Sequence, residues 1–188
     1  FLNRVNELGI TFNGTTSNER VNYYFTLNNK FLTEGLSFMN SAIRYPLFDE
    51  QEMKNENPVV DGEFQRNESN PFFWLYQDLQ KKLWGDLYSR KNTIGDHNII
   101  LTATTAKMRT IQQKYYYPNN SLLVIAGDVN PAKTQKKAAE MLESWAPSDF
   151  DPFVKYPIPE FKPLEKSTLF YTENVNTRNP FIMMGLHG

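Results

Sequence analysis

The sequence predicts an α+β domain of two layers, in which helices pack on one face of a mainly antiparallel sheet. Two short runs rich in β-branched and aromatic residues, 10–16 and 21–27, are separated by only a few polar residues. That separation suits a hairpin and is too short for a parallel crossover. Later stretches repeat apolar residues at helical spacing and interleave with a further apolar run at 122–126.

Caps and helix breakers set the expected bounds of the elements. Gly9 and Gly85 follow helical patterns and are expected to end them. Asp49 is placed as the N-cap of an acidic helix, and Asn70-Pro71 and Asn130-Pro131 have the cap and first-turn proline in the favoured order. In chain order we expect a helix at 1–8, strands at 10–16 and 21–27, helices at 29–44, from 50 through Glu63, from 71 to Gly85 and from about 105 to 116, a strand at 122–126, a helix from 131 to 145, and strands at 167–172 and 181–186.

A proline-rich stretch marks the expected domain boundary. Five prolines fall within residues 147–163, a density that neither a helix nor a regular strand ladder tolerates. We therefore expect a linker at 147–164, with 1–146 as part of an N-terminal domain and 165–188 as the first strands of a second unit. Residues 85–101 are expected to be an irregular surface connection.

Composition limits the class of protein. The 188 residues are 40% hydrophobic, which is enough for a substantial core, and the net charge of -1 argues against a nucleic-acid binder. No run approaches the roughly 18 apolar residues that span a membrane. The absence of cysteine excludes disulfides and thiolate ligands but leaves the compartment open, an extracytoplasmic (periplasmic) one included.

Two glutamates are the candidate metal-binding residues. Glu56 and Glu63 are seven residues apart, so two turns of helix bring both carboxylates to one face. One could bind a metal ion while the other supports it. The alternative is an ordinary solvated acidic face. The chain holds only two histidines, His97 and His187, and they cannot complete a zinc site by helical spacing. We expect His97 to be an exposed loop residue.

Pro58 and Gly62 both lie between these two glutamates, and both residue types disfavour a regular helix. Proline in a helix interior costs about 3 kcal/mol because it removes one hydrogen bond and crowds the preceding turn. We therefore expect a kink near Pro58. If the kink turns Glu56 away from Glu63, the supporting role of Glu56 fails first.

A set of motifs, taken in order, resembles the insulinase/pitrilysin family of zinc metallopeptidases. The motifs are the helical start at 1–9, Asn-Gly-Thr-Thr-Ser at 13–17, Val-Asn-Tyr-Tyr-Phe at 21–25, Pro-Leu-Phe at 46–48, the Glu56 to Glu63 spacing, Tyr-Tyr-Pro-Asn-Asn at 116–120, and Val-Ile-Ala-Gly-Asp at 124–128. In that family an inverted His-x-x-Glu-His motif precedes the segment that resembles 1–9. We therefore interpret the chain as a piece of a longer protein that starts just after the motif.

The resemblance implies roles for the two glutamates. Glu63 matches the family's third zinc ligand, which completes a two-histidine, one-carboxylate site with an open position for water. Glu56 matches an outer-shell group that orients the ligands. The general base belongs to the missing motif, so no catalytic residue is expected within this chain. Zn²⁺ is expected in the intact protein, whereas this piece alone is expected to leave the site empty and to be inactive.

The resemblance also implies a substrate-binding strand and partners. Family members lay an extended peptide along the strand that matches 10–16, so Phe12, Asn13, Gly14 and Thr15 are the expected contacts. The substrate would be a peptide or small protein, and a second homologous domain or subunit the structural partner. The alternative is a non-catalytic paralogue that serves as a scaffold or partner-binding subunit of a peptidase complex.

Overall fold

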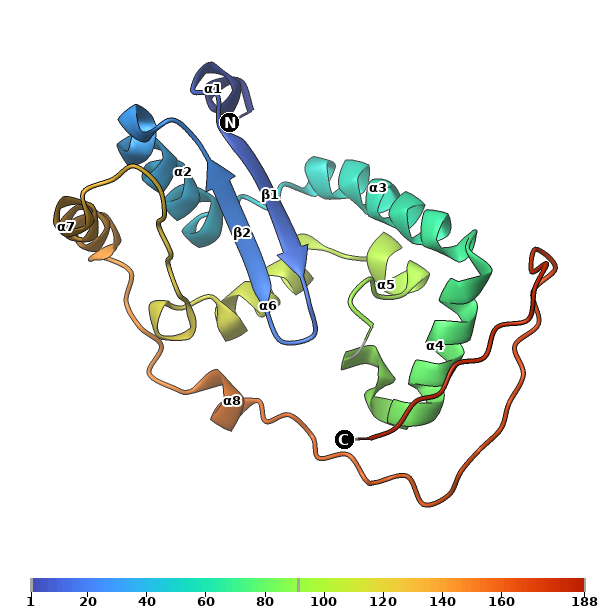
Figure 1. The fold of residues 1–188 in the computed structure, drawn as a ribbon. Coiled ribbons are helices and arrows are strands. Elements are labelled where there is room, and N and C mark those ends of the chain that lie inside the picture. Colours follow the sequence, from blue (N-terminus) through green and yellow to red (C-terminus); the bar gives the residue numbers. More distant parts are fainter. Residues whose placement is uncertain (1, 91, 188) are drawn as a thin grey trace. The chain divides into compact units, whose positions relative to one another are not determined.

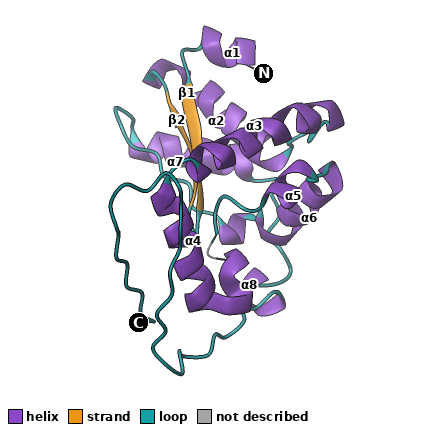
Figure 2. Ribbon diagram, turned by 90° about the vertical axis from the view of Figure 1, so that its right-hand side faces the viewer, coloured by secondary structure: helices purple, strands orange, loops and turns teal. Residues whose placement is uncertain are grey.

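The computed structural model describes residues 2–90 and 92–187, without the side chains of residue 2 and residues 88–90 (Figure 1). The described residues form two strands and a larger number of helices, which Figure 2 distinguishes by colour. In order they are α1 Leu2–Glu7, β1 Thr11–Thr16, β2 Val21–Thr26, the 3-10 helix η1 Asn29–Phe31, α2 Leu32–Arg44, α3 Glu50–Glu68, α4 Pro71–Trp84, the 3-10 helix η2 Gly85–Arg90, α5 His97–Leu101, α6 Thr105–Tyr115, the 3-10 helix η3 Pro118–Asn120, α7 Pro131–Leu142 and α8 Pro152–Lys155.

The predicted hairpin is confirmed. β1 and β2 pair antiparallel, with Thr11 opposite Thr26 and Thr16 opposite Val21. The Ser17 N–H donates to the Arg20 carbonyl at 2.8 Å and closes the turn between them. Hydrogen-bonded and non-hydrogen-bonded pairs alternate along an antiparallel ladder. This closing bond therefore also determines which residues of β1 direct their backbone N–H and C=O groups toward β2.

The α+β, two-layer prediction is also confirmed. Val5, Leu8 and Ile10 form the buried cluster, and Phe25 of β2 packs against it together with Leu27, Phe31 and Phe38. Helical residues therefore cover the face of the hairpin that carries Phe25. The opposite face carries mainly Thr and Asn side chains, a distribution typical of a small antiparallel sheet with one solvated side.

The acidic helix α3 runs without interruption through Pro58, so the proline does not end the helix, and the predicted kink near Pro58 stays a prediction. Asp49 caps the helix, because one of its carboxylate oxygens accepts from the N–H groups of Gln51 and Glu52 at 2.9 and 3.0 Å. Phe64 is 7% exposed. Burial of a phenylalanine contributes roughly 1.5–3 kcal/mol, which is comparable to the cost of the proline.

Most other helices lie where the sequence placed them, with one exception. Asn70 and Asn130 cap α4 and α7 by accepting backbone N–H groups, and Gly85 follows α4 with a positive φ of 51°. The expectation of an irregular connection at 85–101 is wrong, since this segment contains η2 and the short helix α5. Asp96 caps α5 by accepting from the N–H groups of Asn98 and Ile99.

The strands predicted at 122–126, 167–172 and 181–186 are not strands in the described residues. Leu122 and Val124 are 87% and 73% exposed. An apolar, β-branched run indicates that a segment suits a sheet, but a strand forms only where another segment offers a hydrogen-bonded edge. Within the part of the chain that the structure describes, no segment pairs with these runs.

The last residues instead pack as extended chain on α4, where Figure 1 shows the red segment running along the helix. The rings of Phe181 and Phe72 lie 6.2 Å apart edge to face. The His187 ring stacks on Trp84 at 4.8 Å, and its Nε2 lies 2.7 Å from the Leu83 carbonyl oxygen. His187 therefore has a partner that the sequence did not indicate.

The chain forms two compact units, each built from two separate stretches. The first contains residues 1–48 and 106–157, and the second contains residues 49–105 and 158–188. These units divide the chain differently from the predicted ranges 1–146, 147–164 and 165–188, which stay a prediction about domains. Between 147 and 164 the chain is irregular apart from α8. Among the described residues, no helix has the length and apolar character that crossing a bilayer requires.

Replacing the cap of α3 tests the local origin of this helix. Asp49→Ala removes the acceptor for two backbone N–H groups and should lower the free energy of unfolding by about 1 kcal/mol. Asp49→Asn keeps an acceptor of similar reach and should stay close to the unmodified protein. Denaturant unfolding measures both. An alanine variant as stable as the asparagine variant would contradict the assignment of the cap.

Candidate functional site

The two candidate glutamates lie on one exposed face of α3. Both Glu56 and Glu63 are exposed, and neither makes a hydrogen bond or ion pair with any residue that the structure describes. Seven residues correspond to about 700°, so the two side chains project within about 20° of each other around the helix axis. The continuous helix keeps the carboxylates on the same side, as the spacing predicts.

A different face of α3 packs against α5. Asp61 and Phe64 are the buried residues of the helix, and the Asn57 side-chain amide donates to the Ala103 carbonyl at 2.9 Å. Glu68 completes this face, which is about a third of a turn away from the face that carries Glu63. Contact with α5 therefore decides the direction in which the exposed glutamates point.

His97 joins the packed face through both ring nitrogens. Its Nδ1 lies 2.5 Å from Asp61 Oδ1, and its Nε2 lies 3.2 Å from Glu68 Oε2. The ring also contacts Phe64, with centroids 4.2 Å apart. Because both nitrogens can donate only when the imidazole is protonated, this environment favours the imidazolium form.

The carboxylates move the pKa values in opposite directions. Hydrogen bonds to Asp61 and then Glu68 raise the pKa of His97 above 6.5, although desolvation acts against this. The hydrogen bond from His97 lowers the pKa of Asp61 below 3.8, again against desolvation. Asp61 also accepts from Gln65 at 2.7 Å. The cluster is a cation held between two anions.

The prediction that His97 is an exposed loop residue is wrong. His97 begins α5 and is partly buried against α3. A signal was present in the sequence, because Asp61 and Glu68 are separated by seven residues, the same spacing as Glu56 and Glu63. The spacing identifies two acidic pairs on two faces of one helix, and only the fold distinguishes them.

The predicted substrate contacts Phe12, Asn13, Gly14 and Thr15 all lie on exposed β1. The closing bond at Ser17 and Arg20 makes Asn13 and Thr15 the residues whose backbone groups bond to β2. The backbone groups of Gly14 therefore point away from β2, toward the other edge of β1. Among the described residues β2 is the only strand that pairs with β1.

The side chain of Asn13 covers part of that edge. Its Oδ1 accepts from the Gly14 N–H at 2.8 Å. This bond agrees with the register, because a Gly14 N–H directed at β2 would not be available to it. Any peptide that pairs with this edge at Gly14 takes the place of the Asn13 amide oxygen.

Tyr23 and Tyr116 are joined on the covered face of the hairpin. Their hydroxyl oxygens are 2.7 Å apart. Burial, and then the bond to Tyr23, raises the pKa of Tyr116 above 10.0, so the Tyr116 phenol stays protonated at neutral pH. The hydrogen bond between the two hydroxyl groups ties β2 to the segment after α6.

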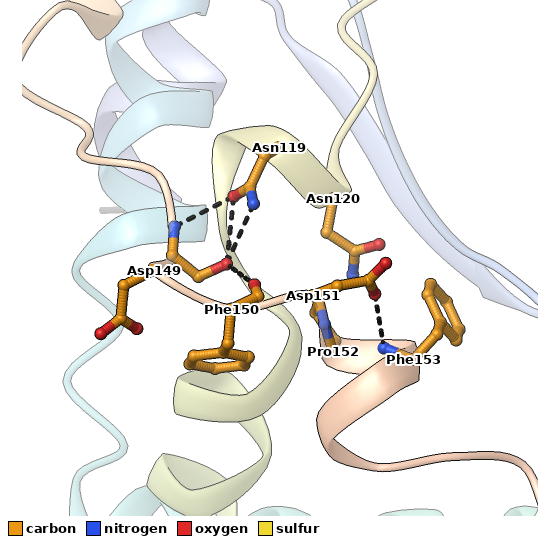
Figure 3. A pocket seen from close by; sticks show the side chains of 8 residues that line it. Asn119, Asn120, Asp149, Phe150, Asp151, Pro152 and Phe153 are labelled. Atoms are coloured by element: carbon orange, nitrogen blue, oxygen red, sulfur yellow. Dashed lines mark hydrogen bonds between the residues drawn. The ribbon is translucent and has the colours of Figure 1, made fainter.

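A shallow pocket lies between η3 and the start of α8 (Figure 3). Asn119 accepts from the Ser148 backbone N–H at 3.0 Å and also donates to the Ser148 hydroxyl. Asp151 caps α8 through the Phe153 N–H at 2.7 Å. The side chains of Asn119, Ser148 and Asp151 are therefore engaged in holding the chain, and the pocket offers no grouping of reactive side chains.

The described residues do not form a complete metal site. No group of three His, Cys, Asp or Glu side chains in ranges 2–90 and 92–187 converges on a point that could bind an ion. Glu63, with Glu56 on the same face, supplies unpaired carboxylate oxygens of a kind that zinc accepts. His97 cannot join them, because its two nitrogens face Asp61 and Glu68.

Sequence comparison decides the family. Residues 1–97 match the model described as insulinase (peptidase family M16), and residues 102–188 match the model described as the peptidase M16 inactive domain. The chain belongs to the insulinase family of peptidases. The acidic pair of α3 and the hairpin lie in the first matched region.

Relatives of this insulinase-family chain carry peptidase names. It is 27% identical over 166 residues to an insulin-degrading enzyme homolog of Dictyostelium discoideum, covering 87% of this chain and 16% of that protein. It is 24% identical over 138 residues to an uncharacterized zinc protease of Rickettsia felis, covering 73% of this chain and 34% of that one. The chain thus spans about a third or less of these relatives.

Solved structures share the fold. A protease from Helicobacter pylori superposes with a TM-score of 0.69 at 22% identity, covering 79% of this chain and 36% of that chain. The first half of the periplasmic protease PqqL from Escherichia coli gives a TM-score of 0.64 at 18% identity, covering 76% and 32%. At these identities the likeness establishes the arrangement of elements.

The His97 cluster of this insulinase-family chain predicts a pH-dependent stability. A raised pKa in the folded state stabilises the protein fully below about 6.5, and this stabilisation is lost as the pH rises through the raised value. His97→Phe should therefore lower the thermal unfolding midpoint most at about pH 6, where Asp61 is still ionised, and less at alkaline pH.

Asn57→Ala is the matched control for this pH dependence, because it removes a contact between the same two helices without a titrating group. Its effect on the midpoint should be constant across the range. A difference between His97→Phe and the unmodified protein that does not shrink as the pH rises would contradict the ion-pair assignment.

Proposed function

We propose that this chain is part of a zinc-dependent endopeptidase in which Glu63 is the carboxylate ligand of the metal and Glu56 orients it. The observation that carries the proposal is the face of α3 on which both glutamates lie. Their carboxylates are exposed and make no bonds with described residues, while the side chains that pack against α5 lie about 80–160° away from them around the helix axis. A helix face without such contacts suits metal ligands that are joined by further ligands from outside these 188 residues.

Two imidazoles from a His-x-x-Glu-His motif outside these 188 residues would complete the site with Glu63. A zinc ion bound there would supply Lewis acidity and a water of lowered pKa. The contribution of this chain is one negatively charged ligand on a helix, with a second carboxylate almost two turns away to steady its orientation. The 188-residue segment alone would lack the histidines and the base, and is therefore proposed to be inactive.

The substrate would be an extended peptide or small protein that pairs with β1. The outward direction of the Gly14 backbone supports this proposal, since it presents N–H and C=O groups at the edge away from β2. Phe12, Asn13, Gly14 and Thr15 would form the contact surface, and the Asn13 amide would turn away from the Gly14 N–H as the peptide carbonyl replaces it. Pairing through the backbone selects for extended shape more than for side-chain identity.

The second candidate is a non-catalytic paralogue that serves as a scaffold or partner-binding subunit. The match of residues 102–188 to a domain described as inactive favours it. A second homologous domain or subunit is proposed as the partner in both cases. The residues that precede Phe1 in the complete reading frame distinguish the two, because a His-x-x-Glu-His motif there supports the peptidase and its absence supports the paralogue.

Substitution of the proposed ligand tests the metal site in the full-length protein. Glu63→Gln keeps the size of the side chain and removes its charge, so zinc retention and peptide hydrolysis should both be lost. Glu56→Gln should weaken zinc binding or activity by about 10–100-fold. Glu52→Gln, an exposed glutamate of the first turn, serves as the control. Zinc content by atomic absorption and peptide turnover measure the effects, and full retention of zinc in Glu63→Gln would refute the role.

Methylation of the substrate backbone tests the strand pairing without altering the protein. N-methyl groups placed in turn at successive residues of a cleaved peptide should block cleavage at every second position, because alternate residues of an added strand direct their N–H groups at β1. Competition binding and turnover of each peptide provide the measurement. Equal tolerance at neighbouring positions would show that the peptide is not bound as a strand.

A further inference from the structure

α3 contacts the rest of its unit through one face. A small number of contacts therefore fixes the rotation of α3 about its own axis. Of its nineteen residues only Asp61 and Phe64 are buried. The Asn57 amide bonds to Ala103 near the middle of the helix, and His97 of α5 bonds to Asp61 and Glu68. At the C-terminal end of α3, the Phe73 ring of α4 contacts Phe64, and the Trp74 indole N–H donates to the Glu68 carbonyl. A helix fixed by so narrow a stripe can turn if the stripe is disturbed.

His97 connects two points on α3 that lie seven residues, or about 10 Å, apart along the helix axis. One imidazole can reach both because long side chains on a helix lean toward its N-terminus, which brings the Glu68 carboxylate back toward Asp61. The bridge therefore spans almost two turns. Rotation of α3 by a single residue step would break both bonds together.

The charges show what removal of His97 would do. Asp61 is 6% exposed, and its second carboxylate oxygen accepts a hydrogen bond from Gln65. Without His97 two carboxylates would lie on the packed face beside the Phe64 ring with no cation between them. Buried carboxylates without a partner are costly, so the helix would turn to bring them toward water. The same turn would redirect Glu56 and Glu63.

We propose that His97 is a positioning residue for the metal site: by clamping Asp61 and Glu68 on one face of α3, it fixes the direction in which Glu63 and Glu56 project from the other face. The proposal rests on the function proposed above for Glu63. It assigns to His97 no contact with metal or substrate. The imidazole acts only through the rotation of α3.

The test compares three variants in the full-length protein. His97→Phe keeps an aromatic ring against Phe64 and removes both donors, whereas His97→Gln keeps one donor group. Thr172→Val is the control, because it removes a 2.7 Å hydrogen bond to Asp78 on α4 in the same unit without touching α3. Zinc affinity is measured by competition with a chelator, and kcat and KM with a cleaved peptide. Circular dichroism establishes that each variant is folded.

His97→Phe should weaken zinc binding by about 10-fold or more and lower kcat with little change in KM. His97→Gln should lie between His97→Phe and the unmodified protein. Thr172→Val should keep both zinc affinity and kcat. If His97→Phe does not fold, His97→Gln decides by the same measurements.

Unchanged zinc affinity in a folded His97 variant would overturn the proposal. An equal loss of zinc affinity in Thr172→Val would also overturn it, because it would indicate a general loss of structural stability. The Glu63→Gln variant distinguishes failure of the proposed metal site from failure of the proposed positioning role of His97. Zinc retention by Glu63→Gln would refute the metal site itself, whereas loss of zinc in Glu63→Gln with no effect of His97 would refute only the clamp.

Discussion

The contact between α3 and α5 is the constraint on which the candidate site depends. α3 is long, charged and mostly exposed, and acidic residues occur on more than one of its faces. The side that faces the protein is selected by Phe64 and by the ionic bridge that His97 forms with Asp61 and Glu68. Because one face is engaged in this way, the face that carries Glu56 and Glu63 stays open.

The helix also illustrates how a local penalty is absorbed. Pro58 and Gly62 both lower the intrinsic stability of α3, yet the helix is continuous from Glu50 to Glu68. The cap at Asp49 and the burial of Phe64 act on either side of the weak point. Tertiary packing commonly outweighs propensity, and here it preserves the two-turn spacing that makes the exposed carboxylates neighbours.

Membership of the insulinase family and the geometry of the two units are complementary. The family match indicates peptidase ancestry, while the hairpin and the open face of α3 identify where this chain could meet a peptide and a metal ion. The edge of β1 and the carboxylates of α3 belong to different units. The chemistry proposed here assigns each unit a separate task, backbone pairing in one and metal coordination in the other.

The sequence by itself determined the elements whose signals are local. Caps such as Asp49 and Asn70, the turn between the two strands, and the position of Glu56 above Glu63 follow from bonds between residues close in the chain. The hairpin and most helices were therefore predictable, and so was the exposed acidic pair.

Only the tertiary structure decided which segments find distant partners. The run at 122–126 has the composition of a strand but no described edge to join, and His97 reads as a loop residue until α5 is placed against α3. Asp61 and Glu68 have the same spacing as Glu56 and Glu63, so periodicity cannot distinguish the pair that bonds to His97 from the exposed pair. The difference arises from a contact across more than thirty positions of chain, which no local pattern encodes.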